Sequence, residues 1–117
     1  MNDIIRHLKS KNVKEALFLR NSIKKNIREF MSNKGFIEID TPIMGPPIPE
    51  YQNSQYVVYD MDKNNFYLSQ SPQIYKQILM NAGYEKYFQF AHCFRNNEKH
   101  DSSHLNEFMQ IDVELQT

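Results

Sequence analysis

The sequence has one cysteine, no tryptophan and only three glycines in 117 residues. The single cysteine, Cys93, excludes an intramolecular disulfide and a cysteine-built zinc site, and it suits a reducing compartment. Net charge is also absent, because fourteen Lys and Arg balance fourteen Asp and Glu, so no overall field attracts nucleic acid or anionic lipid. There is no signal-peptide core at the N-terminus and no apolar run near the roughly 20 residues that span a bilayer. These absences predict a cytoplasmic protein with no membrane segment.

What is present suffices for one small core. Apolar residues make up 40% of the chain, a little below the usual globular range of roughly 45–50%. Aromatic residues make up 13% and offset part of that deficit, because Phe and Tyr each bury a large area. A chain of 117 residues is one domain at most, and its aromatic content and zero net charge disfavour intrinsic disorder.

The first third of the chain is predicted to be helical, since no Gly or Pro occurs in residues 1–34. Its apolar residues recur at helical steps from Val13 onward: Leu17, Ile23, Ile27, Phe30 and Met31. Gly35 stands where a helix end favours a residue that tolerates positive φ. Residues 36–40 then alternate as a half-buried strand does, and Thr41-Pro42 ends that strand.

The middle of the chain is predicted to hold a loop, a hairpin and a second helix. Residues 42–55 carry most of the prolines and form the loop. Strands at 55–59 and 65–68 flank a polar turn. Ser71-Pro72 is a helix-opening pair, with Ser as the cap and Pro at the first helical position, and the helix ends near Gly83.

Two further strands are predicted at 87–95 and 106–115, joined by a polar loop that could fold over a ligand. In the second strand the odd positions are apolar and the even positions are Phe108, Gln110, Asp112 and Glu114. This alternation predicts one solvated face that carries two acids, an amide and a ring. Such a face can form the floor of a site.

Four side chains are candidates for ligand binding: three can donate to anionic groups and one is an aromatic ring. Arg95 at a strand end is a planar donor fork that matches phosphate oxygens, or else a solvated charge. Phe108 is either a stacking ring or a core aromatic. Gln73 and Lys76 are three residues apart and share one helical face, where they either bind carboxylate or are ordinary exposed residues.

Three segments resemble one family. Asn33-Lys-Gly-Phe-Ile-Glu-Ile-Asp-Thr-Pro42 resembles the first signature of class II aminoacyl-tRNA synthetases, at about 20–42. Phe94-Arg95 with Glu107-Phe108 resembles the second signature, at about 88–114. Between them, Gln70-Ser-Pro-Gln-Ile-Tyr-Lys76 is similar to the amino-acid-recognition segment (70–79) of aspartyl-tRNA synthetases. The order of the three identifies residues 1–117 as a single partial domain, the N-terminal half of a subclass IIb catalytic domain.

The resemblance implies a fold, an activity and a site. The fold is α+β, an antiparallel sheet flanked by helices. The activity is activation of L-aspartate with ATP to aspartyl-adenylate, for transfer to tRNA. The implied ATP-binding residues are Arg95, Asn97, His104, Leu105 and Phe108, of which Arg95 is catalytic because it holds the α-phosphate while Phe108 stacks on adenine. The implied amino-acid-binding residues are Glu50, Gln73 and Lys76. Lys76 reads the aspartate side chain, Gln73 places the α-amino group and Glu50 receives the ammonium.

Two departures leave other functions open. The family usually has a Glu where Asn97 stands and an Arg where Ser103 stands, so both a base contact and a phosphate clamp are weakened. The third signature and the acidic residues that hold most of the Mg²⁺ lie beyond Thr117 in the family, and no metal-ligand set is expected within the chain. The alternative is a truncated non-catalytic paralogue that acts as a binding or dimerisation module. A third possibility is an asparagine-forming or other amino-acid-ligating relative.

The expected partners follow the same resemblance. The first signature forms the dimer interface of class II synthetases, and an apolar stripe on 13–31 would need a surface to cover it, so a homodimer through this helix and strand is expected. We expect tRNA as a partner if the chain is part of a full synthetase. Lys24, Lys25 and Arg28 are either a solvated helix face or an RNA contact.

Overall fold

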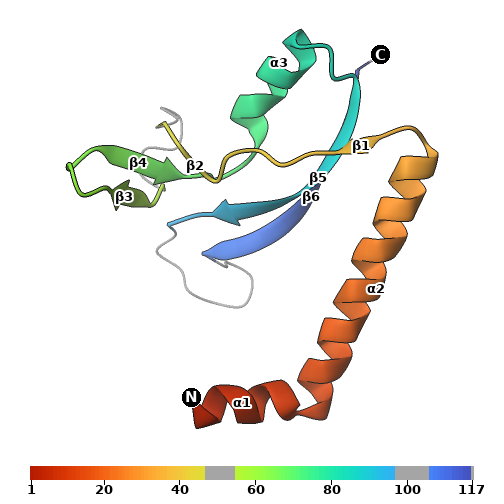
Figure 1. Ribbon diagram of the computed structural model, residues 1–117, viewed down its shortest axis with the longest axis vertical. Coiled ribbons are helices and arrows are strands. Elements are labelled where there is room, and N and C mark those ends of the chain that lie inside the picture. The colour runs from red at the N-terminus through yellow and green to blue at the C-terminus, as the bar shows by residue number, and fades with distance from the viewer. Residues whose placement is uncertain (47–54, 97–105, 117) are drawn as a thin grey trace. The chain divides into compact units, whose positions relative to one another are not determined.

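The computed structural model describes residues 1–46, 55–96 and 106–116 (Figure 1). The described chain contains three helices and six strands in the order α1, α2, β1, β2, β3, β4, α3, β5, β6. It divides into two compact units, residues 1–36 and residues 37–117. No helix in the described part of the chain is long and apolar enough to cross a membrane.

The first unit consists of two helices, α1 (Asn2–Lys9) and α2 (Lys11–Asn33). The predicted helical region is therefore interrupted at Ser10, which has an extended backbone. Its hydroxyl accepts a hydrogen bond from the Val13 amide at 3.4 Å and caps α2. Serine is common at such caps because its hydroxyl can accept a hydrogen bond from a backbone amide at the start of the helix. The spacing of apolar residues does not indicate this break.

Helix α2 ends just before Gly35, as the sequence predicts. Gly35 has φ +85°, in the left-handed region that side chains with a Cβ avoid. The Phe36 amide donates to the Met31 carbonyl at 3.0 Å, and the Gly35 amide donates to the Ser32 carbonyl at 3.0 Å. These two bonds are the paired contacts of a Schellman cap, which satisfies carbonyls that the helix end leaves without partners.

The second unit contains a sheet with strand order β1–β5–β6. Its strands are β1 (Ile37–Glu38), β5 (Lys86–Phe94) and β6 (Glu107–Leu115). β5 and β6 form a long antiparallel pair, from Lys86 opposite Leu115 to Phe94 opposite Glu107. β1 lies parallel to β5 and is shorter than the alternation at 36–40 predicts, although the Ile39 amide still donates to the Phe88 carbonyl at 2.9 Å.

A smaller antiparallel sheet has the order β2–β4–β3. It contains β2 (Met44–Gly45), β3 (Val57–Tyr59) and β4 (Asn65–Leu68). The β3–β4 hairpin is as predicted, and Asp60 closes its turn by accepting hydrogen bonds from the Asp62 and Asn64 amides. The Asn64 side chain also donates to this carboxylate and is the largest cause that lowers the pKa of Asp60. β2 falls within the segment predicted to be a loop.

The remaining helix, α3 (Gln73–Asn81), begins one residue later than predicted. The Gln73 amide donates to the Ser71 hydroxyl at 3.4 Å, but Pro72 occupies the cap position that the sequence predicts for Ser71, so the helix-opening pair is displaced by one residue. Gly83 follows the helix end with φ +94°. The core of the described chain lies along β5, where Tyr87, Phe88 and Cys93 are the fully buried large side chains.

Candidate active site

The polar face of β6, formed by Phe108, Gln110, Asp112 and Glu114, faces protein. Each of these residues is half-buried. The apolar residues on the opposite face of the same strand are more open, with Ile111, Val113 and Leu115 exposed to 49%, 45% and 51%. The prediction that the polar face is the solvated one is therefore wrong. Lys76 of α3 pairs with Glu114 on this face, and Thr41 bonds to Gln89 of β5 beside it. The alternation of residues along β6 could not show which face these segments cover.

The register of the β5–β6 pair decides which side chains meet on the polar face. Cys93 is opposite Phe108, Ala91 opposite Gln110, Gln89 opposite Asp112 and Tyr87 opposite Glu114. Residues directly opposite in an antiparallel pair share one face. The four β5 members are buried, so the face is a covered surface built from two strands.

At one end of this face, Lys76 of α3 pairs with Glu114. The Lys76 Nζ atom lies 3.0 Å from a Glu114 carboxylate oxygen. The Glu114 side chain is 13% exposed, whereas the Lys76 side chain is 38% exposed. An ammonium has three donors, so a lysine held by one carboxylate can still donate to a second. Glu114 lies on the predicted floor, but its role as the partner of Lys76 depends on a packing that the sequence does not show.

At the other end, the Arg95 guanidinium lies over the Phe108 ring. The Arg95 Cζ atom is 5.0 Å from the ring centroid, within the distance of a cation–π contact. The Arg95 amide also donates to the Asn106 carbonyl at 2.8 Å, which extends the pairing of β5 and β6 beyond Phe94. The Arg95 cation and the Phe108 ring are thus in contact. The sequence predicts that these two residues bind a phosphate and the adenine ring of one ligand.

In the middle of the polar face, the surroundings of Asp112 disfavour its charged form. Burial raises the pKa of Asp112 above its ordinary value, and the neighbouring Glu114 charge raises it further. A hydrogen bond from the Gln89 side chain and the charge of Lys76 act in the opposite direction. Burial also raises the pKa of Tyr87 and of Cys93, and the Asp112 charge contributes to both. The acids on this face therefore act on one another.

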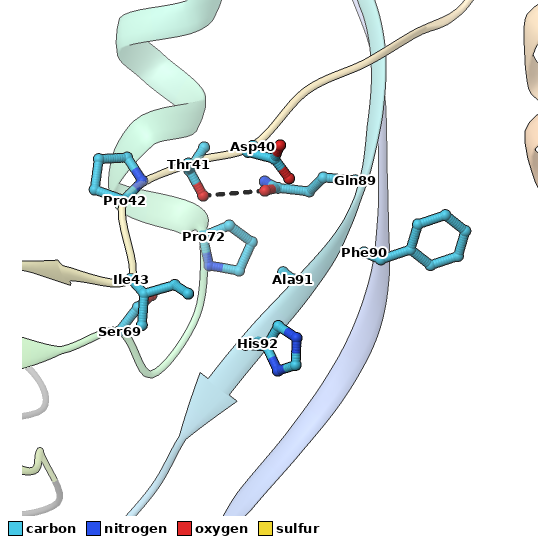
Figure 2. Close-up of a pocket in the computed structure, with 10 residues that line it drawn as sticks. All are labelled: Asp40, Thr41, Pro42, Ile43, Ser69, Pro72, Gln89, Phe90, Ala91 and His92. Carbon is cyan, nitrogen blue, oxygen red and sulfur yellow. Dashed lines mark hydrogen bonds between the residues drawn. The ribbon is translucent and has the colours of Figure 1, made fainter. Parts of the chain in front are cut away.

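A small cavity lies beside β5 near Thr41 (Figure 2). Its volume is about 130 Å³, and residues 40–43 and 89–92 provide most of its lining together with Ser69 and Pro72. The Thr41 hydroxyl donates to the buried Gln89 carbonyl oxygen at 3.0 Å, and Figure 2 shows the Phe90 ring pointing away from this pair. Ligand pockets usually enclose about 300–1,000 Å³, so this cavity is too small for a nucleotide. Arg95, Phe108 and Lys76 do not line it.

The other predicted site residues divide into two groups. Gln73 begins α3 with an exposed side chain, one turn before Lys76. Glu50, Asn97, His104 and Leu105 lie outside the described residues, as does Ser103. Within the part of the chain that the structure describes, no three His, Cys, Asp or Glu residues gather as metal ligands would.

A comparison with protein families identifies the family of the chain. A family model described as "tRNA synthetases class II (D, K and N)" matches residues 1–117. The chain belongs to this family. The synthetase chain is 40% identical over 109 residues to the aspartate–tRNA ligase of Thermosipho africanus, and 43% identical to the aspartate–tRNA(Asp/Asn) ligase of Syntrophomonas wolfei. Each match covers 92% of this chain but only 19% and 18% of those relatives, so the chain spans about a fifth of their length.

Solved synthetase structures share the fold. The asparaginyl-tRNA synthetase of Entamoeba histolytica superimposes with a TM-score of 0.83 at 23% identity, covering 98% of this chain and 25% of that protein. The Pyrococcus horikoshii enzyme, solved with asparaginyl-adenylate, gives a TM-score of 0.80 at 24% identity over 92% of this chain and 24% of that protein. The predicted resemblance and the α+β fold class are confirmed.

Proposed function

We propose that the chain provides part of the ATP- and aspartate-binding site of an aspartate–tRNA ligase. In this reaction a carboxylate oxygen of aspartate attacks the ATP α-phosphate, the bond to the β-phosphate breaks, and aspartyl-adenylate and pyrophosphate form. The aspartyl group then passes to tRNA. The observation that carries the proposal is that the Arg95–Phe108 contact and the Lys76–Glu114 pair lie on one face of the β5–β6 pair.

The spacing of these two pairs suits an elongated ligand. Phe108 and Glu114 are six residues apart on β6, and a strand rises about 3.4 Å per residue, so they are separated by about 20 Å. A ligand that contacts both ends must be long and must present different chemistry at each end. A nucleotide joined through its phosphate to an amino acid has this form.

At the nucleotide end, Arg95 binds the α-phosphate and Phe108 stacks on the adenine. The guanidinium occupies one side of the ring, and an aromatic ring has a second side on which a base can stack. Arg95 neutralises the charge that develops on phosphorus, and its fixed position beside the ring limits the reorganisation needed during reaction. Asn97, His104 and Leu105 complete this half of the proposed site.

At the amino-acid end, Lys76 selects the aspartate side chain. Its ammonium is charged, is 38% exposed and is oriented by Glu114, so it favours a carboxylate over the neutral amide of asparagine. Gln73, one helical turn earlier, helps to place the α-amino group, and Glu50 receives the ammonium. No side-chain nucleophile or general base is required, because the substrate carboxylate is itself the nucleophile and the rate comes from positioning and charge neutralisation.

The proposal extends to Mg²⁺, partners and location. Mg²⁺ usually keeps several waters and binds through one or two carboxylates and the substrate phosphates. The resemblance to class II synthetases implies that its protein ligands lie mostly outside this chain, and we derive no step through it. A second copy of the chain binds through α2 and β1, tRNA accepts the aspartyl group, and the reducing cytoplasm is the compartment that the free Cys93 suits.

Isotopic exchange between pyrophosphate and ATP tests the activity. In the intact protein we expect exchange that depends on aspartate, with far less when Asn or Lys replaces it. Arg95→Ala should reduce the rate by about 10²–10³-fold, the usual cost of removing a group that stabilises transition-state charge. The matched control is Arg6→Ala in the exposed α1, which should leave the rate unchanged.

The departures at Asn97 and Ser103 favour the non-catalytic paralogue as the second candidate. It predicts no exchange and, by calorimetry, no heat with ATP or aspartate. Exchange that depends on asparagine instead would favour the other amino-acid-ligating relative. Either result would refute the aspartate–tRNA ligase proposal.

A further inference from the structure

We propose that Gln89 and Thr41 are positioning residues of the amino-acid half of the site: the Thr41 hydroxyl orients the Gln89 amide, and that amide fixes the Asp112 carboxylate on the polar face. The proposal rests on the proposed function in one respect, that Asp112 lies in the part of the site that receives the amino acid. The three residues come from the chain after β1, from β5 and from β6.

The geometry of Gln89 determines which end of its amide faces Asp112. The Gln89 side chain is 2% exposed, and its carbonyl oxygen accepts the Thr41 hydroxyl at 3.0 Å, as the dashed line in Figure 2 shows. Since the oxygen is engaged by Thr41, the NH₂ group is the end available to another acceptor. Asp112 is opposite Gln89 in the strand register and accepts a side-chain hydrogen bond from it.

The Asp112 carboxylate depends on this donor because of its other neighbours. Lys76 from α3 is already 3.0 Å from Glu114, and Glu114 lies two residues along the same face. Burial and the Glu114 charge both disfavour a second carboxylate there. The other titratable groups that couple to Asp112, Tyr87 and Cys93 on β5, are acids and provide no positive charge. The Gln89 side chain is thus the neutral donor that, together with the Lys76 charge, favours the charged form of Asp112 against burial and Glu114.

A buried glutamine could also satisfy its hydrogen bonds without any effect on the site. Two variants of Thr41 separate these cases. Thr41→Val keeps the shape but removes the hydroxyl, which frees the Gln89 amide to turn its oxygen toward Asp112. Thr41→Ser keeps the hydroxyl and serves as the matched control.

Titration of the Asp112 carboxyl carbon by NMR in the intact protein, without substrate, is the first test. Thr41→Val should raise the pKa of Asp112 by roughly one unit, about a tenfold change in its acid dissociation constant, as expected for loss of a hydrogen bond to a charged group. Gln89→Leu should raise it at least as much, and Thr41→Ser should leave it unchanged. Equal titration in the wild type and Thr41→Val would overturn the proposal.

Steady-state kinetics of exchange is the second test. Thr41→Val should raise the KM for aspartate about tenfold and leave the KM for ATP unchanged, while Thr41→Ser should change neither. A general loss of structure would instead raise both constants or lower the amount of folded protein, and an equal rise in both would count against the proposal. If the wild type shows no exchange with aspartate, the proposed function fails, and the NMR titration alone decides the positioning role.

Discussion

The Asp112 carboxylate lies where burial and a neighbouring acid disfavour its charged form. Because burial and Glu114 raise the pKa of Asp112, the folded state binds its proton more tightly than the unfolded state does. Stability then falls as the pH rises from the ordinary value of 3.8 through the raised pKa, and the charged Asp112 reduces stability at neutral pH. Sites that serve function commonly retain such groups at a cost in stability.

Asp112→Asn should therefore raise the melting temperature at pH 7. The amide removes the charge but can still form a hydrogen bond. The difference from the wild type should shrink toward zero below pH 3.8, where the wild-type carboxyl is protonated in both states. Thermal unfolding by circular dichroism across this pH range is the measurement, with Asp62→Asn in the exposed turn as a control. A lower melting temperature for Asp112→Asn at pH 7 would show that this carboxylate stabilises the fold.

The sequence predicted several site residues but not the contacts that connect them. Arg95 next to Phe108 follows from their places at the facing ends of two strands, and the structure confirms their contact. The Lys76–Glu114 pair and the Thr41–Gln89 hydrogen bond join residues 38 and 48 positions apart. Such contacts depend on strand register and on how α3 packs, and apolar spacing along one segment contains neither.

At the scale of elements, most helices and strands followed from local signals. Gly35 and Gly83 correctly marked the ends of α2 and α3, and Ser71-Pro72 marked the start of α3 to within one residue. The two-residue β2 was missed because its pairing with β4 comes from tertiary contact and not from propensity. On β6 the alternation showed which residues share a face, but not which face the rest of the protein covers.

Gly35→Ala should destabilise the cap of α2. At φ +85° an added Cβ costs about 1–2 kcal/mol in the left-handed region, while Asn tolerates this region better. Urea unfolding followed by helical circular dichroism should show a lower midpoint for Gly35→Ala and a smaller decrease for Gly35→Asn. Equal midpoints for Gly35→Ala and the wild type would contradict the role of the cap.

At the scale of the whole molecule, α2 carries large apolar side chains that are exposed. Leu19, Ile23 and Phe30 lie on one side of this helix and are exposed to 62%, 47% and 60%. Exposed apolar patches of this kind mark association surfaces in soluble proteins. The chain also spans only about a fifth of the length of the relatives that it matches.

Sedimentation at micromolar concentration should give a mass of two chains. Phe30→Glu should shift the mass toward one chain, because a charge is placed within the apolar surface. Asn21→Glu adds the same charge nine residues away, on the opposite side of a helix with 3.6 residues per turn, and should leave the dimer intact. A mass of one chain for the wild type would refute the homodimer.

Cys93 gives the molecule a built-in reporter. It is the one thiol in the sequence, it is 0% exposed near the Phe94–Glu107 end of the β5–β6 pair, and burial raises its pKa. A thiol reagent reacts with the thiolate and needs access to the sulfur, so alkylation of Cys93 requires the two strands to separate locally. The labelling rate therefore measures how often this strand pair opens, and slower labelling with ligand present would reveal occupancy of the face without any label added by mutation.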